Sequence, residues 1–196
     1  MSKLIFNMSM SLDGFVAGPN GEVDDLFRWY FGGDTEFPFP GSDYVFKVAP
    51  ASAEVLQAAK RTVGAIVTGR RNFDNANAWN GSPPLGVPHF VVTHNVPQEW
   101  VYEGSMFTFV TDGVESAVAQ ARQLAGDKDV VVSSANIMQQ CLTAGLLDEI
   151  TIDLVPILLG AGLRLFDHLG NQPIELEQMS VIEGMGVTHL RYRVVK

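Results

Sequence analysis

Two adjacent arginines follow a short apolar stretch, in a segment that could bind an anion. The stretch at residues 63–67 is continued by Thr68-Gly69-Arg70-Arg71-Asn72-Phe73. Gly69 permits a tight turn, and a helix starting after it would direct free N–H groups toward a phosphate. The forked guanidinium of arginine also binds phosphate through two parallel hydrogen bonds. The pattern indicates a phosphate site, and its alternative is a solvated arginine pair at the start of a short helix.

Two further apolar runs end in small polar residues. Thr93 and His94 follow one run and could donate hydrogen bonds to phosphate or ribose oxygens, although an ordinary loop fits equally well. The other run ends at Ser133-Ser134-Ala135-Asn136-Ile137, where a helix N-terminus could receive a pyrophosphate. A plain serine cap is the alternative there. If all three places share one edge of a sheet, they predict an extended anionic ligand such as a dinucleotide.

A carboxylate near the N-terminus is the candidate for contacting an organic substrate. Asp13 follows an apolar segment and precedes Gly14. Because a carboxylate there loses hydration unless it is paired, it could accept hydrogen bonds from an amidine-like heterocycle edge or from sugar hydroxyls. Its alternative is an Asx turn that caps the next two residues. Trp29 and Phe46 could stack on a flat ring, and core packing explains them equally well.

Several other chemistries lack the residues that they need. The chain has no G-x-S-x-G, no Walker A motif and no complete G-x-G-x-x-G. A single cysteine excludes an internal disulfide. The four histidines show no metal-ligand spacing, so we expect no metal; these histidines are His89, His94, His168 and His189. The net charge of -9 repels phosphate backbones, so we expect no nucleic-acid partner.

The segments that must position these residues alternate between strand and helix patterns. Eight stretches have the β-branched content of strands: 3–10, 63–68, 88–93, 107–111, 130–133, 149–156, 174–182 and 187–195. The middle ones are near-continuous apolar runs, typical of strands covered on both faces. In the last stretch apolar and polar residues alternate after a Gly-Met-Gly turn, which indicates an antiparallel pair.

Helices are expected at 52–61, 114–125 and 136–144. An apolar stripe marks the second of them: Val114, Ala117, Val118, Ala121 and Leu124. Asp112 with Glu115 resembles a capping box at its start. The order of elements predicts a single α/β domain over 1–196, a three-layer mixed sheet flanked by helices, with antiparallel C-terminal strands. Ligands would then bind at the carboxyl ends of the parallel strands.

The composition indicates a folded protein with no membrane partner. Hydrophobic residues make up 46% and charged residues 18% of the 196 residues, and no apolar run approaches the roughly 20 residues that span a bilayer. The N-terminus lacks the pattern of a signal peptide, so we expect a cytoplasmic location. The irregular stretch at 32–50 is rich in aromatic residues, and its part at 37–46 is expected to form either a lid or a dimer contact.

The chain resembles the dihydrofolate-reductase-like superfamily. The similarity rests on Ser11-Leu12-Asp13-Gly14, on Gly69-Arg70-Arg71-Asn72-Phe73, and on a longer C-terminal block. That block reads Gly145-Leu-Leu-Asp148-Glu149-Ile-Thr-Ile-Asp-Leu-Val-Pro156-Ile-Leu-Leu-Gly160-Ala-Gly162, followed by Leu165-Phe166. Within the superfamily, the chain is most similar to the C-terminal reductase domain of bacterial bifunctional riboflavin biosynthesis deaminase-reductase proteins.

The resemblance implies an NADPH-dependent reductase that is usually a homodimer. The family's cofactor-contacting stretches fall here on Ala17, Thr68, Gly69, Arg70, Arg71, Thr93, His94, Ser133, Ser134, Ala135, Asn136, Ile137, Leu159, Gly160 and Gly162. Its substrate side falls near Asp13 and the 17–21 loop, including Gly21. This chain has Ser133-Ser134-Ala135 where the family usually has Gly-Gly-Ala, and Asn72 where a threonine is common.

We therefore expect hydride transfer to a small pterin- or aminopyrimidine-like heterocycle, as in reductases of 5-amino-6-(5-phosphoribosylamino)uracil. Asp13 would orient the substrate or help to deliver a proton, and Arg70 and Arg71 would bind phosphate. One alternative is a non-catalytic nucleotide- or pterin-binding relative that has lost efficient turnover, which Ser133-Ser134 would favour. A dimeric scaffold protein is a third possibility.

Overall fold

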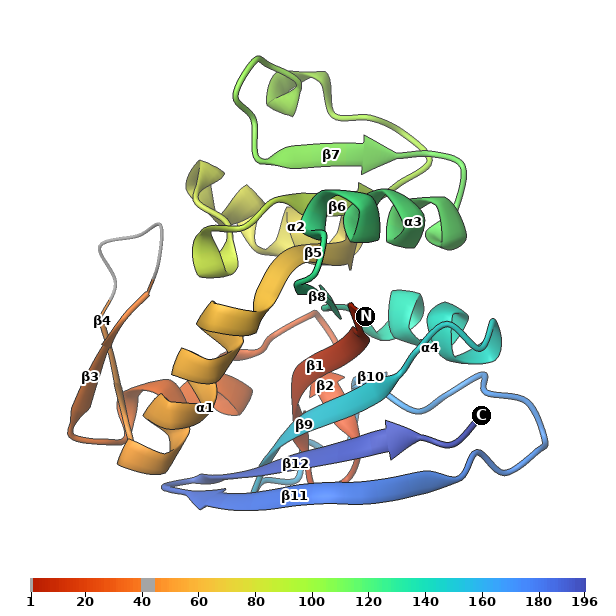
Figure 1. Ribbon diagram of the computed structural model, residues 1–196. Helices are drawn as coiled ribbons and strands as arrows, with labels where there is room; N and C mark the ends of the chain where they lie inside the picture. The colour runs from red at the N-terminus through yellow and green to blue at the C-terminus, as the bar shows by residue number, and fades with distance from the viewer. Residues whose placement is uncertain (1, 40–44) are drawn as a thin grey trace.

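One eight-stranded sheet organises the molecule. The computed structural model describes residues 2–39 and 45–196 (Figure 1). The strands lie in the order β11-β12-β9-β1-β8-β5-β6-β7. Their bounds in that order are Leu176–Gly184, Val187–Val194, Glu149–Val155, Leu4–Ser11, Asp129–Val132, Val63–Gly69, His89–Val92 and Phe107–Val110. All eight predicted strands are confirmed, with ends that shift by no more than two residues.

The sheet is mixed, as the sequence predicts. The strands from β9 to β7 in that order run parallel to one another, whereas β12 is antiparallel to β9 and β11 is antiparallel to β12. Apolar runs form the central strands because both faces are covered: Ala65, Val67, Val130 and Val132 are completely buried. The α/β fold class and the antiparallel C-terminal strands are therefore confirmed.

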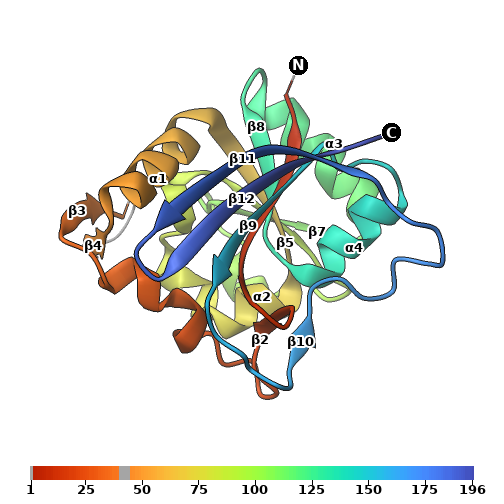
Figure 2. The same ribbon diagram turned by 90° about the horizontal axis from the view of Figure 1, so that it is seen from below.

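Helices lie on both sides of this sheet. Figure 2 shows α1 (Pro50–Thr62) on one side, and α3 (Val114–Ala125) and α4 (Ala135–Thr143) on the other. A short helix, α2 (Arg70–Asn75), follows β5 without an intervening loop. The main core fills the space between the sheet and the pair α3 and α4. On the side of α1, only Ser52 of that helix is buried, so this side of the sheet is less tightly covered.

Several short elements have no counterpart in the sequence prediction. They are β2 (Phe15–Ala17), η1 (Asp24–Phe31), β3 (Thr35–Pro38), β4 (Val45–Val48), η2 (Asn77–Gly81), η3 (Pro84–Gly86), η4 (Gln98–Trp100) and β10 (Leu163–Arg164). Strands β3 and β4 pair as a hairpin, and β10 pairs with β2. Part of the aromatic stretch expected to be a lid or a dimer contact, residues 40–44, lies outside the described residues.

The start of α3 corrects one sequence prediction. Gly113, at φ 105°, takes the N-cap position, and no side chain caps the helix. The predicted capping box of Asp112 and Glu115 is therefore wrong, because Asp112 stands one residue too early to reach the first turn. Leu124, expected on the buried stripe, is 57% exposed.

In the described part of the chain, none of the helices combines the length and the apolar character required to traverse a bilayer.

Candidate functional site

The three predicted anion-binding segments meet at one edge of the sheet. Gly69 at the end of β5 is paired with Val92 at the end of β6, and Val67 is paired with Val132 at the end of β8. The amide of Ser133 donates to the carbonyl of Val67 at 3.0 Å, which extends the alignment beyond β8. The carboxyl ends of three adjacent parallel strands therefore converge, as the sequence predicts.

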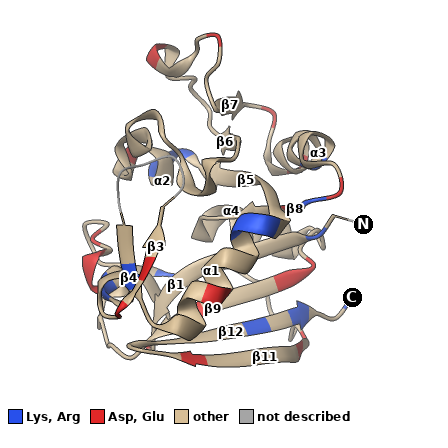
Figure 3. Ribbon diagram, turned by 60° about the vertical axis from the view of Figure 1, so that its left-hand side comes forward, with Lys and Arg blue, Asp and Glu red and all other residues tan. Residues whose placement is uncertain are grey.

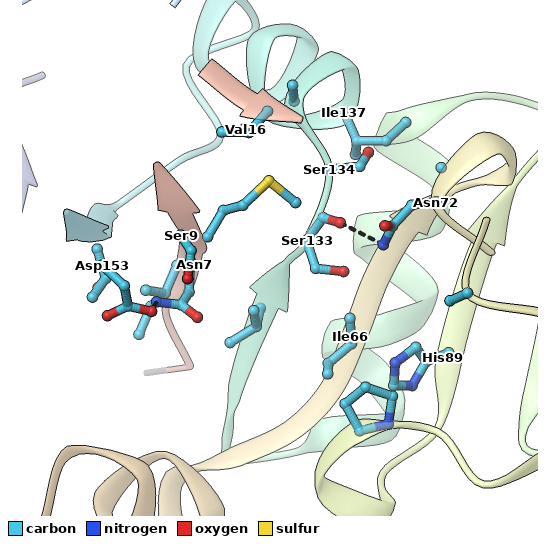
Figure 4. Close-up of a pocket in the computed structure, with 18 of the residues that line it drawn as sticks. Asn7, Ser9, Val16, Ile66, Asn72, His89, Ser133, Ser134, Ile137 and Asp153 are labelled. Carbon is cyan, nitrogen blue, oxygen red and sulfur yellow. Dashed lines mark hydrogen bonds between the residues drawn. The ribbon is translucent and has the colours of Figure 1, made fainter. Parts of the chain in front are cut away.

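These strand ends open into a cleft of about 1360 Å³ that runs across the face of the sheet (Figure 4). Most of the predicted cofactor residues line it: Ala17, Gly69, Arg70, Arg71, Thr93, His94, Ser133, Ser134, Ala135, Asn136 and Ile137. Of the predicted substrate residues, Gly21 and Trp29 line it as well. Asp13, Phe46, Thr68, Leu159, Gly160 and Gly162 are not part of its wall.

Gly69 and Ser134 form the tightest corner of this edge. A Cβ atom built on Gly69 would lie 3.0 Å from Oγ of Ser134 and 3.4 Å from the Ile137 side chain. The Ser134 hydroxyl is buried and has no hydrogen-bond partner among the described residues, although this serine is the N-cap of α4. A buried hydroxyl without a partner is unfavourable. The corner thus offers a ligand one free hydroxyl beside the N-terminus of a nine-residue helix.

Asn72 explains one departure from the family pattern. Its Nδ2 donates to the Ser133 carbonyl at 2.9 Å (Figure 4). It also donates to the Thr68 hydroxyl at 2.9 Å. Thr68 is completely buried, and its hydroxyl donates to the same Ser133 carbonyl at 3.3 Å. Asn72 therefore ties the end of β5 to the end of β8 and keeps the two strand ends in register.

The two arginines of α2 differ in their surroundings. Arg70 donates from Nε to Asp74 at 2.7 Å and from Nη1 to the carbonyl of Asn95 at 2.6 Å. Arg71 is exposed on the cleft, and no ion pair joins it to another described residue. Figure 3 shows this basic pair at α2. Arg70 fixes the loop after β6, whereas the charge of Arg71 is available to a ligand.

The loop after β6 is held by its own residues. The Thr93 hydroxyl donates to the carbonyl of Asn95 at 2.8 Å and accepts from the amide of Asn95 at 3.2 Å. Thr93 therefore shapes the loop, and His94 is left exposed at the cleft.

Asp13 is occupied by the protein itself. Its carboxylate accepts hydrogen bonds from the hydroxyl of Ser11 at 2.6 Å and from the amides of Leu159 and Gly160 at 3.1 and 2.7 Å. The Ser11 bond lowers the pKa of Asp13 most, burial opposes this effect, and the amides of Gly160 and Leu159 lower it further. These contacts tie the turn after β1 to the 159–160 loop, and the predicted contact of Asp13 with substrate stays a prediction.

Gly162 and Phe46 also pack away from the cleft. A Cβ atom at Gly162, where φ is +139°, would collide with the carbonyl of Ala17, so this glycine lets the two segments approach. The Phe46 ring packs against Tyr30, with the ring centres 4.5 Å apart. Phe46 thus supports Tyr30, which itself lines the cleft.

A buried polar chain that the sequence did not reveal forms another wall of the cleft. Asp153 of β9 and His189 of β12 are cross-strand neighbours. Oδ1 of Asp153 accepts a hydrogen bond from Nδ1 of His189 at 2.6 Å, and Nε2 of His189 lies 2.8 Å from Oγ of Ser52. All three residues are buried. The three residues are linked in the order Ser-His-Asp, but Ser52 lies under Gly184 and does not line the cleft.

Further polar and aromatic groups surround Asp153. Asn7 donates from Nδ2 to Oδ2 of Asp153 at 3.2 Å, and Figure 4 shows Asn7, Ser9 and Asp153 grouped on one side of the pocket. Trp29 donates to the hydroxyl of Ser9 at 3.1 Å and packs edge-on against His189. Burial, and then the Asp153 charge, raise the pKa of the Tyr30 phenol, which therefore stays protonated. We call Asn7, Ser9, Trp29, Tyr30, Asp153 and His189 the polar wall.

The acidic pair of the C-terminal block has a structural role. Oδ2 of Asp148 accepts from the amide of Leu4 at 2.8 Å, and Glu149 binds Lys3 at 2.7 Å and Nε of Arg191 at 2.6 Å. Burial would raise the pKa of both carboxyl groups, but these partners hold it below the ordinary value. The pair thus fixes β9 between β1 and β12.

Comparison with known proteins gives the same fold. The Bacillus subtilis (strain 168) uncharacterized protein YwjB is 23% identical over 170 residues, which cover 87% of this chain and 86% of that protein. A putative riboflavin biosynthesis protein from Shewanella sp. PV-4 superposes with a TM-score of 0.73 at 22% identity, covering 99% of each chain. Dihydrofolate reductase from Enterococcus faecalis, complexed with NADP(H), superposes with a TM-score of 0.63 at 13% identity, covering 99% of this chain and 97% of the other.

The sequence pattern of the RibD C-terminal domain family matches residues 2–190. The match spans nearly the whole chain, and the solved structures just described share its dihydrofolate-reductase-like fold. The chain therefore belongs to the RibD C-terminal domain family.

Proposed function

We propose that this protein is an NADPH-dependent reductase acting on a small pterin- or aminopyrimidine-like heterocycle. The observation that carries the proposal is that one cleft joins a phosphate-binding edge, made of three strand ends, to a polar wall with a buried carboxylate. The shared fold with a dihydrofolate reductase solved with NADP(H) supports the choice of cofactor.

The residues at the edge suit the cofactor. Gly69, the free Ser134 hydroxyl and the start of α4 at Ala135, Asn136 and Ile137 would hold the pyrophosphate. Arg71 would bind the 2′-phosphate that distinguishes NADPH from NADH, since its charge is not taken by another described residue. Arg70, Thr93 and His94 would shape and complete this edge. When bound, the cofactor would supply the hydride.

The polar wall suits a heterocycle with several N–H groups. Asp153 and Asn7 present acceptor oxygens at the cleft, and Tyr30 presents a protonated phenol. A flat ring bearing amino or amide N–H groups could donate to these oxygens while it packs against Trp29. Asp153 therefore takes, in this proposal, the substrate-orienting role that the sequence suggested for Asp13.

The Asp153–His189 pair can also hold a proton beside the substrate. Among the described residues, this 2.6 Å contact is the only one that either side chain makes with a group able to carry the opposite charge. Burial of a carboxylate is costly unless it is paired, and the hydrogen bond from Nδ1 of His189 to Oδ1 of Asp153 supplies both the partner and a proton between the two groups. We propose that this proton reaches the ring nitrogen of the reduced substrate, and that Ser52 holds His189 in place.

The predicted homodimer also remains a proposal. Strand β11 pairs with β12 on one side and, among the described residues, with no strand on the other. It exposes several apolar side chains: Leu176, Met179, Val181 and Ile182. Because an exposed apolar edge favours pairing with another chain, we propose that two copies associate there. Light scattering of the unaltered chain and of Val181→Lys would test this, and a monomer in both cases would contradict it. The cytoplasmic location likewise stays a prediction.

The test of function is a titration with NADPH and NADH, followed by turnover assays on dihydrofolate and on aminouracil compounds. We expect tighter binding of NADPH and oxidation of NADPH with at least one of these heterocycles. Equal binding of the two cofactors would contradict the role of Arg71. Tight binding of NADPH without turnover across the panel would instead favour the non-catalytic relative, and an absence of nucleotide binding would favour a scaffold.

A further inference from the structure

One imidazole in the cleft belongs to neither the phosphate-binding edge nor the polar wall. His89 is 1% exposed, and its ring lines the cleft. Its Nδ1 lies 2.9 Å from the carbonyl of Val87, so Nδ1 carries the hydrogen and Nε2 carries a free lone pair. Nε2 is buried and lacks a partner in the part of the chain that the structure describes. A buried acceptor in this state is a position at which a ligand donor would be favourable.

Two turns with left-handed backbone carry bulky side chains that line the same cleft as this imidazole. Four consecutive residues, Asn77, Ala78, Trp79 and Asn80, have φ between 47° and 51°, and Leu85 has φ 61°. Residues other than glycine rarely adopt this left-handed backbone conformation, and it persists only where the surrounding structure imposes it. The Trp79 ring lies 5.1 Å from the ring of His89, and both Trp79 and Leu85 line the cleft.

The chemistry of this region selects an uncharged ligand. Ile66, the cross-strand partner of His89, lies beside it in Figure 4 and adds another apolar surface. An anion would be repelled by the lone pair of Nε2, and a cation would lose its hydration among Ile66, Trp79 and Leu85. Burial lowers the pKa of His89 to about 4, so the ring stays neutral near pH 7.

We propose that Ile66, Trp79, Leu85 and His89 form a separate subsite for an uncharged ring that carries one N–H or O–H donor. The donor bonds to Nε2 of His89, and the ring packs against Trp79. This subsite goes beyond the reductase proposal, because its occupation requires neither the cofactor nor turnover. If hydride transfer also proves correct, the subsite would hold an uncharged ring attached to the substrate.

Three small probes of similar shape test the subsite on the full chain: 4-methylphenol, toluene and 4-methylbenzoate. Affinities are measured by calorimetry, and the ¹⁵N resonance of His89 Nε2 is followed by NMR. We expect 4-methylphenol to bind about three- to tenfold more tightly than toluene, as one neutral hydrogen bond allows. The Nε2 resonance should shift with 4-methylphenol and stay in place with toluene, and 4-methylbenzoate should bind most weakly.

Two variants separate the hydrogen bond from the apolar walls. His89→Phe should abolish the preference for 4-methylphenol over toluene. Trp79→Gly relieves the left-handed strain, so it should fold even if His89→Phe does not, and it should weaken both probes. The control is His168→Asn, at an exposed histidine with φ 55°. Asparagine tolerates this left-handed backbone conformation, so the variant should change neither affinity.

Several outcomes would overturn the subsite. Equal affinities of 4-methylphenol and toluene for the unaltered chain would mean that the hydroxyl of the probe makes no hydrogen bond in the subsite. A preference that survives His89→Phe would mean that this hydrogen bond is made to another residue. An Nε2 resonance that does not shift with 4-methylphenol would show that the hydroxyl of this probe does not bond to His89. Tighter binding of 4-methylbenzoate, or no binding of any probe at millimolar concentration, would also contradict the proposal.

Discussion

The proposed phosphate-binding edge, made of the ends of β5, β6 and β8, and the polar wall of the same cleft are built in different ways. At the edge, ligand groups would meet a glycine, a helix start and short side chains that follow directly on strand ends. At the wall, they would meet side chains from β1, β9, β12 and η1, which are brought together only by the pairing of strands far apart in the sequence. The edge thus depends on local backbone geometry, and the wall depends on the register of the whole sheet.

Asp153→Asn is expected to have the largest effect, and it should act on the wall alone. The amide keeps the shape of the side chain and can still accept a hydrogen bond from His189, but it cannot take up a proton. Turnover should fall about hundred- to ten-thousandfold, the usual contribution of a positioned acid or base. NADPH affinity should stay unchanged, because Asp153 does not belong to the edge. Steady-state assays and fluorescence titration measure the two quantities separately.

The control for this variant is Asp167→Asn, which alters an exposed aspartate that also contacts a histidine, His168 at 3.7 Å. It should leave turnover and binding intact. If Asp153→Asn retained full turnover while melting at the same temperature as the unaltered protein, the wall would have no part in catalysis.

The two arginines of α2 should differ in the same way that their surroundings differ. Arg71→Ala should weaken NADPH roughly ten- to a hundredfold, because a hydrogen bond to a charged group contributes about 1.5–3 kcal/mol. NADH should be little affected. Arg70→Ala should weaken both cofactors to a smaller and similar extent, since it loosens the loop that includes Asn95.

The matched control is Arg193→Ala. It removes an exposed arginine of β12 that is paired with Glu177 of β11, at the end of the strand order away from α2. The ratio of NADPH to NADH affinity decides the outcome. A ratio that changes with Arg70 and not with Arg71 would reverse the assignment.

Much of the edge was predictable from sequence because its geometry leaves local marks. Gly69 after an apolar run and Ser134 before a helical pattern each show, without knowledge of the fold, where a strand ends. The eight strands were predicted for the same reason: β-branched runs bounded by turn residues are local. Three-strand convergence then followed from the parallel order of the sheet.

The polar wall was not predictable in the same way. Asp153 interrupts an apolar strand, and that interruption was the one available signal, since a lone buried carboxylate requires a partner. Its partner His189 is 36 residues away, and only the register of β9 with β12 brings them together. Asp13 attracted attention because it is part of a local motif, yet its partners Leu159 and Gly160 are even more remote in sequence, at 146 and 147 residues.

Ser134→Ala, at the edge, should stabilise the ligand-free chain but weaken the binding of NADPH. Removing a buried hydroxyl that lacks a partner should raise the free energy of unfolding of the ligand-free chain by up to about 1 kcal/mol. The same change should weaken NADPH by about two- to tenfold, because the ligand loses one hydrogen bond. Chemical denaturation and cofactor titration measure the two effects, and a loss of stability without a change in affinity would show that the hydroxyl serves the fold.

The smallest effect is expected from Asp13→Asn, which belongs to neither the edge nor the wall. Since the native pKa of Asp13 lies below its ordinary value of 3.8, its carboxylate stabilises the fold above that pH. The contribution is lost as the pH falls below 3.8 through the native value. The variant should therefore melt at a lower temperature at pH 7, and the difference should shrink toward zero in acid.

Asp127→Asn, at an exposed turn, serves as the control for that pH series and should melt like the unaltered chain throughout. A difference for Asp13→Asn that grows as the pH falls would contradict the carboxylate contacts.

A crystal structure with NADPH bound tests the proposal most directly. We predict continuous density for the cofactor in contact with Gly69, Arg71 and Ser134 together, with its nicotinamide end directed toward Asp153. Cofactor density that touches only one of the three strand ends, or that lies outside the cleft, would contradict the proposed reductase site.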